Sequence, residues 1–153
     1  MRNDAAPSLS PAESRDLQRL AGLMVPASAT FAIPGADDPV IFADILNSLG
    51  RDFAAVRQGL TELATLAGGS FADLDPATAE ATAKAFWTSG SPALTGLGRA
   101  VLQCYYRDDR VVRSLGLEPR PPFPQGRTVE QGDWSLLDPV RNRPKFWRDD
   151  RRV

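Results

Sequence analysis

The sequence predicts an all-α protein, an irregular bundle of about five helices followed by an extended C-terminal arm. Apolar residues recur at helical spacing in the long segments between residues 10 and 115, and no stretch alternates apolar and polar residues over the length of a strand. Residues 117–153 combine proline and aromatic residues in a way that suits neither a helix nor a disordered tail. We therefore expect a helical domain over residues 1–116 and an extended arm over residues 117–153.

The first helix is expected to begin at residues 10–13 (SPAE), which have the pattern of a capping box with proline at the first helical position. An apolar stripe of helical period follows, made of Leu17, Leu20, Ala21 and Met24. The helix is expected to end at Val25, because the residue before a proline is pushed out of the helical region.

Two further helices are expected to begin at an Asp-Pro pair. Residues 38–39 open a short helix that ends before Gly50, and residues 75–76 open one that runs through Trp87. Between them, a helix over residues 51–67 ends at a pair of glycines. Its apolar face consists of Phe53, Val56, Leu60, Leu63 and Ala67.

The last helix of the domain is expected to begin after the break at residues 89–92 (SGSP), with Ser114 as its furthest residue. Its predicted inner face consists of Leu94, Leu97, Val101, Cys104 and Tyr105. A Gly-x-Gly pattern at residues 96–98 lies inside this helix and not after a strand. We interpret it as close helix packing and not as a phosphate loop.

The composition restricts the chemistry of the chain. Histidine is absent, which removes the commonest general base and metal ligand. Cys104 is the only cysteine, so it cannot form an intrachain disulfide, and we expect it to be a buried structural thiol. The formal net charge of -1 gives no global attraction for nucleic acid or anionic membranes. We expect no catalytic residue, cofactor or metal in this chain, and carboxylate-based catalysis stays as a third hypothesis.

The densest polar and aromatic cluster is residues 105–110 (YYRDDR). Tyr105 continues the buried stripe, whereas Tyr106 and Arg110 are i, i+4 neighbours at the rim of the expected helix. One interpretation is a core tyrosine beside a solvated, salt-bridged helix end; the other is a rim that receives the arm or another protein. The acidic pairs at residues 108–109 and 149–150 are flanked by arginines, so we interpret them as solvated ion pairs and not as metal ligands.

The arm carries large apolar side chains that need shelter, either on its own domain or on another protein, and the two alternatives are not exclusive. These side chains are Phe123, Trp134, Leu136, Leu137, Phe146 and Trp147. Residues 120–124 (RPPFP) favour polyproline II, residues 133–137 (DWSLL) favour a single turn, and residues 142–147 (NRPKFW) favour a second extended segment.

A partner-binding site is the function that this pattern favours, because aromatic residues and arginine are the side chains most often found as binding hot spots. The expected contact residues are Tyr106, Arg110, Pro121, Pro122, Phe123, Trp134, Pro144, Phe146 and Trp147.

Three segments resemble the small subunits of bacterial, heteromeric FAD-dependent dehydrogenases, including the gluconate 2-dehydrogenase subunit 3 group. They are residues 142–147 (NRPKFW), 105–116 (YYRDDRVVRSLG) and 9–27 (LSPAESRDLQRLAGLMVPA). The resemblance implies a non-catalytic, chaperone-like subunit that stabilises or helps mature a large sugar or alcohol dehydrogenase of the glucose–methanol–choline (GMC) type. It implies that FAD lies in that large flavoprotein subunit, with a cytochrome subunit as an optional further partner. Because the sequence has no long apolar run, we expect no direct membrane insertion.

The alternative function is a stand-alone helical regulator or nucleic-acid-binding protein. Residues 141–153 have six cationic and two acidic residues, a net charge of +4, with Phe146 and Trp147 between them. Such a basic aromatic tail can bind single strands by stacking, although the main hypothesis has no nucleic-acid partner. The sequence has no apparent export signal and no long apolar run, so we expect a cytoplasmic protein. A periplasmic location, as a mature form or by export with its partner, is the alternative.

Overall fold

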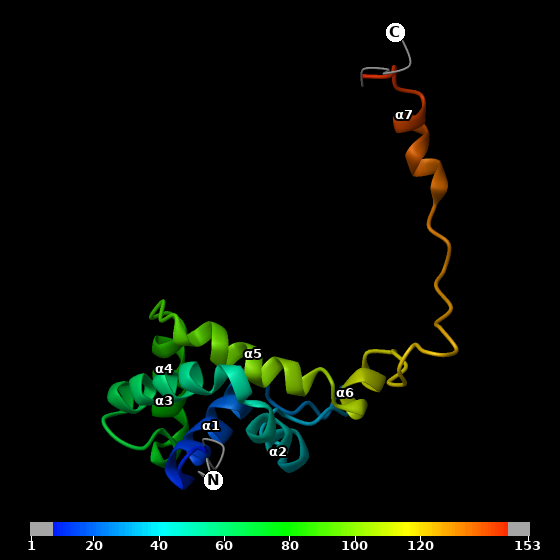
Figure 1. The fold of residues 1–153 in the computed structure, drawn as a ribbon. Coiled ribbons are helices and arrows are strands. Elements are labelled where there is room, and N and C mark those ends of the chain that lie inside the picture. The colour runs from blue at the N-terminus through cyan, green and yellow to red at the C-terminus, as the bar shows by residue number, and fades with distance from the viewer. Residues whose placement is uncertain (1–7, 147–153) are drawn as a thin grey trace, which may run out of the picture. The chain divides into compact units, whose positions relative to one another are not determined.

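The computed structural model of the chain describes residues 8–146. Within these residues every regular element is a helix, apart from an isolated antiparallel bridge between Ser28 and Ile33. The all-α prediction is therefore confirmed (Figure 1). The chain divides into two compact units, Met1–Pro119 and Arg120–Val153.

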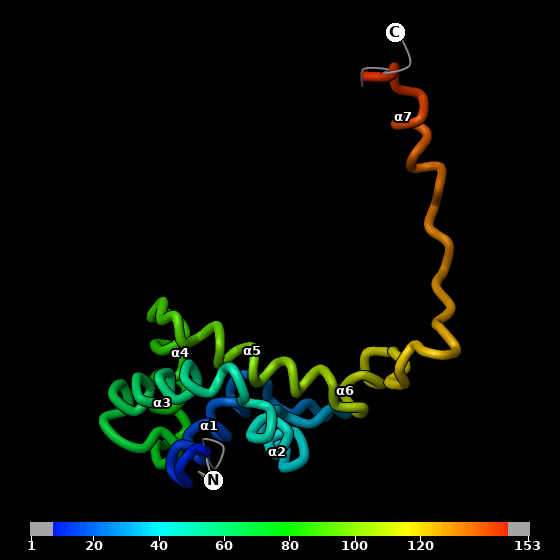
Figure 2. The backbone as a smooth tube through the Cα atoms, viewed as in Figure 1, coloured from blue at the N-terminus to red at the C-terminus, as the bar shows by residue number. Residues whose placement is uncertain are grey.

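Helices α1 to α6 belong to the first unit, and Figure 2 follows the backbone through them. Their bounds are α1 (Pro11–Met24), α2 (Pro39–Ser48), α3 (Phe53–Ala67), α4 (Pro76–Trp87), α5 (Ala93–Tyr105) and α6 (Asp109–Ser114). Short 3₁₀ helices precede α3 (Gly50–Asp52) and α4 (Phe71–Asp73). In the described part of the second unit, a 3₁₀ turn (Trp134–Leu137) leads into α7 (Asp138–Arg141).

The predicted helix starts are confirmed by their capping contacts. At α1 the Ser10 hydroxyl accepts from the Glu13 N–H at 3.2 Å, and the Glu13 carboxylate accepts from the Ser10 N–H at 2.7 Å. Asp38 caps α2 and Asp75 caps α4, each by accepting from two backbone N–H groups of the first turn. These contacts satisfy donors that have no partner inside the helix, so the start points are fixed by local chemistry.

Two predicted boundaries were wrong. The helix expected from Arg51 begins at Phe53, because residues 50–52 form a 3₁₀ turn. The helix expected to reach Ser114 ends at Tyr105, because the Asp108 side chain accepts from the Arg110 N–H and caps a separate helix, α6. A residue that can cap competes with helix continuation, and here the cap prevails.

The buried core lies in the first unit, where α3 packs against α1, α4 and α5, and α2 packs against α5. The predicted stripes face this core, with Leu17 and Leu20 on α1, Leu63 on α3 and Leu97 on α5 fully buried. The stripes end in half-buried residues, namely Met24, Phe53, Ala67 and Leu94. Apolar residues at helical spacing therefore identified the inner face of each long helix.

A buried polar contact joins α1 to the 3₁₀ helix at Phe71–Asp73. The Asp16 carboxylate accepts from the Ala72 N–H at 2.7 Å and from the Ser70 hydroxyl at 3.1 Å. Arg19 donates to the backbone carbonyls of this same turn, and its guanidinium lies 5.8 Å from the centre of the Phe71 ring. These bonds compensate the burial of Asp16 and hold the loop between α3 and α4.

Gly96 confirms the interpretation of residues 96–98 as close helix packing. A β-carbon added to Gly96 would lie 2.6 Å from the Ala55 Cβ on α3. A β-carbon added to Gly98 would instead meet only the Met24 Cε, at 3.8 Å, which is an ordinary contact. Helices α3 and α5 thus approach closely at Gly96, and Gly98 does not share that constraint.

We expect Gly96→Ala and Gly98→Ala to change stability in opposite directions. Gly96→Ala should lower the free energy of unfolding by about 1–3 kcal/mol, because the added methyl group overpacks the α3–α5 contact. Gly98→Ala should raise it by about 0.5–1 kcal/mol, because alanine has the higher helix propensity. Urea unfolding measures both. Stabilisation by both substitutions would contradict a close α3–α5 approach.

Candidate interaction surfaces

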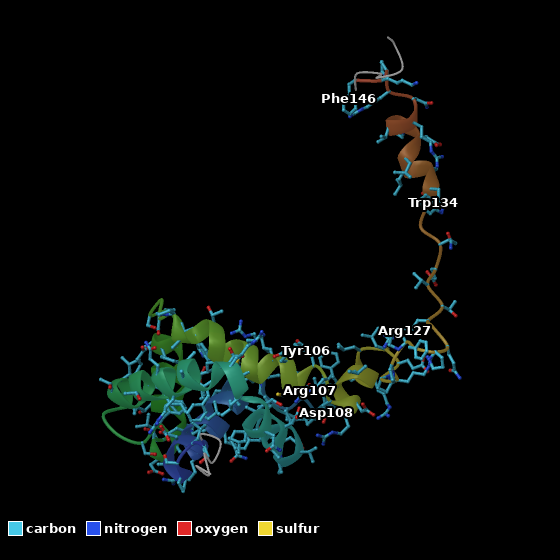
Figure 3. The ribbon with its side chains drawn as sticks, viewed as in Figure 1. Tyr106, Arg107, Asp108, Arg127, Trp134 and Phe146 are labelled. Carbon is cyan, nitrogen blue, oxygen red and sulfur yellow. The ribbon has the colours of Figure 1, made fainter. Side chains whose placement is uncertain are left out.

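Tyr106 lies at the C-terminal end of α5 and is 56% exposed. Its ring meets the buried Tyr105 ring edge-on, with centroids 5.2 Å apart and planes at 84°. Tyr105 is anchored in turn, because its hydroxyl donates to the Pro34 carbonyl at 3.2 Å. Tyr106, which is labelled in Figure 3, is therefore an exposed aromatic ring that packs against a core residue.

The helical i, i+4 relation expected between Tyr106 and Arg110 was wrong. Tyr106 is the C-cap of α5, whereas Arg110 lies in α6, and residues 106–108 separate the two helices. Arg110 points to acidic groups instead: its guanidinium forms ion pairs with Asp38 at 2.7 Å and with Asp108 at 3.0 Å. Asp38 and Asp108 are the caps of α2 and α6, so Arg110 joins two helix starts.

Arg107 makes a second link between the same parts of the chain. Its Nε donates to the Asp44 carboxylate at 2.6 Å, and its Nη2 bonds the second Asp44 oxygen and the Ser48 hydroxyl. Both Asp44 and Ser48 lie on α2. The planar guanidinium thus binds a carboxylate with both ends of its fork, which orients the link between α2 and the α5–α6 turn.

These ion pairs shift the acid–base properties of the helix end. Arg110 lowers the pKa of the Asp38 and Asp108 carboxyls, and Arg107 lowers the pKa of the Asp44 carboxyl. Burial raises the pKa of the Cys104 thiol, which is 1% exposed. Cys104 is the buried thiol that was predicted, and the acidic pair at residues 108–109 is held in arginine ion pairs as expected.

We expect the free energy of unfolding to be nearly constant between about pH 6 and 8 and to fall as the solution is acidified below about pH 4. The pKa values of Asp38, Asp44 and Asp108 are lower in the folded chain than unfolded. Their contribution is therefore present above the unfolded pKa and is lost as pH falls through the folded pKa. Chemical unfolding at a series of pH values measures this. A stability that stays flat down to pH 3 would contradict it.

In the second unit, residues 120–127 form a closed loop. The Arg120 guanidinium donates to the Gly126 carbonyl at 2.8 Å, and Arg127 donates back to the Arg120 carbonyl at 3.0 Å. The Gly126 N–H bonds the Pro122 carbonyl, which makes a turn at residues 123–125 and interrupts the extended form expected there. Pro121 and Pro122 are exposed, and Phe123, inside the turn, is 85% exposed.

The turn predicted at residues 133–137 is confirmed as a 3₁₀ helix over Trp134–Leu137. The Asp133 carboxylate caps it by accepting from the Ser135 N–H at 3.0 Å and from the Ser135 hydroxyl at 2.6 Å. Trp134 is 61% exposed, and its indole N–H donates to the Gln131 side chain. Local hydrogen bonds therefore order the backbone while the indole ring faces outward.

Residues 142–146 leave α7 without regular structure. Pro144 is exposed and Phe146 is 89% exposed, whereas Trp147 lies outside the described residues. Every residue from 121 to 146 is exposed. The large apolar side chains among them are Phe123, Val129, Trp134, Leu136, Leu137, Val140 and Phe146.

Within residues 8–146, no group of three or more acidic or cysteine side chains is arranged to hold a metal ion. In the same part of the chain, no helix has the length and apolar character needed to cross a membrane.

Sequence reasoning missed the links that cross between helices. Nothing in the sequence around Asp44 indicates Arg107, which is 63 residues away, or ties Asp52 to Arg99 at 3.0 Å across 47 residues. The one available signal was Asp38, whose role as a helix cap was predicted and whose second role toward Arg110 was not. Capping depends on neighbours in the chain, whereas these ion pairs depend on how the helices pack.

The fold and its surfaces define a class, a small helical protein whose second unit carries exposed aromatic and aliphatic side chains on locally ordered turns. Comparisons with family models, with curated proteins and with solved structures found no match.

Proposed function

We propose that this chain is a non-catalytic small subunit that binds a large FAD-dependent sugar or alcohol dehydrogenase of the GMC type and stabilises it or helps it mature. The flavin belongs to the large subunit, and this chain contributes a binding surface. The observation that carries the proposal is the exposure of seven large apolar side chains within residues 121–146, in a chain whose helical unit has its own core.

Exposure of an apolar segment to water is unfavourable. Burial of that surface on a partner favours binding by roughly 25 cal/mol for each square ångström of apolar area removed from water. Contiguous exposed apolar surface on a soluble protein marks an interaction site. Phe123 and Trp134 are held on turns that local hydrogen bonds close. Partial ordering of this kind lowers the entropic cost of binding.

The kind of partner is argued from the three segments that resemble dehydrogenase small subunits. Two of them lie at the surfaces described above: residues 105–116 contain Tyr106 and Arg110, and the described part of residues 142–147 contains Pro144 and Phe146. A stable complex would bury about 800 Å² on each partner. The contact residues of the proposal stay those expected from the sequence.

Co-expression tests the proposal. The chain is produced alone, and then together with a large flavoprotein subunit of the GMC type as the proposed partner, and both are analysed by size-exclusion chromatography and by flavin absorbance. We expect the chain alone to be prone to aggregation at high concentration, and the two proteins together to elute as one complex with more flavin-loaded enzyme. Subunits that are each soluble and fully active alone, and that do not co-elute, would contradict the proposal.

The nucleic-acid hypothesis predicts a different result. Its basis is the basic aromatic tail at residues 141–153, of which Arg141, Arg143, Lys145 and Phe146 lie within the described residues. Titration of a single-stranded oligonucleotide at increasing salt would then give tight binding that weakens steeply. Such binding, without co-elution with the flavoprotein, would replace the proposed function.

A further inference from the structure

Residues 134–141 form one continuous helical segment, the 3₁₀ turn Trp134–Leu137 followed by α7. Residues i and i+3 eclipse in a 3₁₀ helix, so Trp134 and Leu137 lie on one side. Each later residue turns by about 100° in an α-helix, so Val140 falls beside Leu137. Leu136 borders the same side. We call these four residues the apolar face of the segment.

The opposite side is polar and makes its hydrogen bonds and ion pairs within the segment and its cap. It consists of Ser135 and Asp138, with Arg141 at its edge, one helical turn after Leu137. Ser135 bonds the capping carboxylate of Asp133, and Arg141 forms an ion pair with Asp138 at 3.4 Å. The apolar face is exposed instead: Trp134 by 61%, Leu136 by 74%, Leu137 by 41% and Val140 by 59%. The segment therefore has a polar side with hydrogen bonds and an ion pair of its own, and an apolar side that is exposed.

Charge is divided along the segment in the same direction as the helix dipole. Residues 128–138 contain Glu130, Asp133 and Asp138 and no cation, whereas residues 139–146 contain Arg141, Arg143 and Lys145 and no acid. Acids near the start of a helix and cations near its end both stabilise it. The same asymmetry gives a bound helix a direction, because each end attracts the opposite charge on a partner.

We propose that residues 134–141 bind as a helix in an apolar groove of the large flavoprotein subunit, with the apolar face buried in the groove. The groove has cationic side chains at the end that receives residues 130–133 and carboxylates at the end that receives residues 141–145. This inference rests on the proposed function and names the recognition mode, helix-in-groove binding with anchors at helical spacing.

Leu137 distinguishes this mode from binding as an extended strand. Side chains alternate along a strand, so an extended segment would place Leu137 opposite Trp134 and beside Ser135. In the helix, Leu137 lies with Trp134, and Ser135 lies on the other side. The helical mode therefore buries Leu137 together with Trp134, whereas the extended mode places Leu137 on the same side as Ser135, away from Trp134.

The first experiment measures the affinity of the full chain for the flavoprotein by isothermal titration calorimetry. We expect Leu137→Ala to weaken binding at least about tenfold, as for a hot-spot residue. Ser135→Ala is the matched control and should change the affinity by less than about threefold. Loss of affinity with Trp134→Ala but not with Leu137→Ala would overturn the helical mode.

A second pair of variants tests the helix without touching its apolar face. Asp133→Ala removes the cap, which should weaken binding about fivefold because the unbound segment becomes less helical. Asp133→Asn removes the charge but keeps a capping oxygen, so it should weaken binding less than Asp133→Ala does, and its remaining loss measures the attraction between the Asp133 carboxylate and the cationic end of the groove. Equal affinities for Asp133→Ala and the wild type would overturn the helical mode.

The failure of this inference is distinguishable from that of the proposed function. If the wild-type chain does not bind the flavoprotein, the proposed function fails and the inference fails with it. If the wild-type chain binds but neither Leu137→Ala nor Asp133→Ala has an effect, the function stands and only the helical mode is wrong.

Discussion

The triple variant Phe123→Ala/Trp134→Ala/Phe146→Ala should lose the proposed association with a flavoprotein subunit, with at least about a hundredfold weaker binding. The three rings are 85%, 61% and 89% exposed, and each lies in a different part of residues 120–146. Their removal takes away the large aromatic surface that a partner would bury, and it leaves the charges unchanged. Titration calorimetry with the full chain measures the loss.

Phe31→Ala is the matched control for the triple variant. Phe31 is 71% exposed and lies in the loop between α1 and α2, outside the proposed contact residues. It should bind like the wild type. All four rings are exposed, so neither protein should change its free energy of unfolding by more than about 0.5 kcal/mol. Full affinity of the triple variant would contradict the proposed surface, and a much lower stability would mean that the rings are sheltered by this chain itself.

Phe86→Ala should destabilise the helical unit by about 3–5 kcal/mol, the largest stability effect that we expect of a single substitution. Phe86 is 1% exposed on α4. A β-carbon added to Gly59 on α3 would lie 3.4 Å from its Cζ, so the ring reaches the surface of α3. Alanine would leave a cavity between the two helices. Since small domains have only about 5–15 kcal/mol of stability, this loss is a large share of the total.

Trp87 provides the signal for this measurement, because it is the only tryptophan in the helical unit and its ring centre lies 5.5 Å from that of Phe86. Replacing Trp134 and Trp147 by phenylalanine leaves the Trp87 fluorescence as the reporter of urea unfolding. Phe31→Ala serves again as the control, with a loss below about 0.5 kcal/mol. A loss below about 1 kcal/mol for Phe86→Ala would contradict its place in the core.

The two phenylalanines show which structural features could be predicted from the sequence and which could not. Phe86 lies in the helix that was predicted through Trp87, but its burial against α3 depends on the crossing of helices far apart in the sequence. The exposure of Phe123 agrees with a proline-rich segment. The turn at residues 123–125 was not expected, because the bonds of Arg120 and Arg127 that close the loop are specific to this arrangement.

The candidate surfaces also combine features that could be predicted from the sequence with features that could not. Asp133 caps the turn that was predicted at residues 133–137. Tyr106 was predicted at a rim and is exposed there, but its expected neighbour was wrong. The Asp108 cap begins a new helix in place of a longer α5. Arg110 therefore lies in α6, where it forms an ion pair with Asp38. A periodic pattern does not reveal such a break when both helices share the apolar spacing.

The sequence by itself determined the helical class, the starts of α1, α2 and α4, and the inner faces of the long helices. Caps and stripes act between residues at most about four positions apart, so the sequence contains all the information that they need. Only the tertiary structure decided the close approach at Gly96 and the ion pairs of Arg107 and Arg110 with α2. Those features depend on which surfaces meet after the chain has folded, and the contacts that decide them join residues up to 72 positions apart.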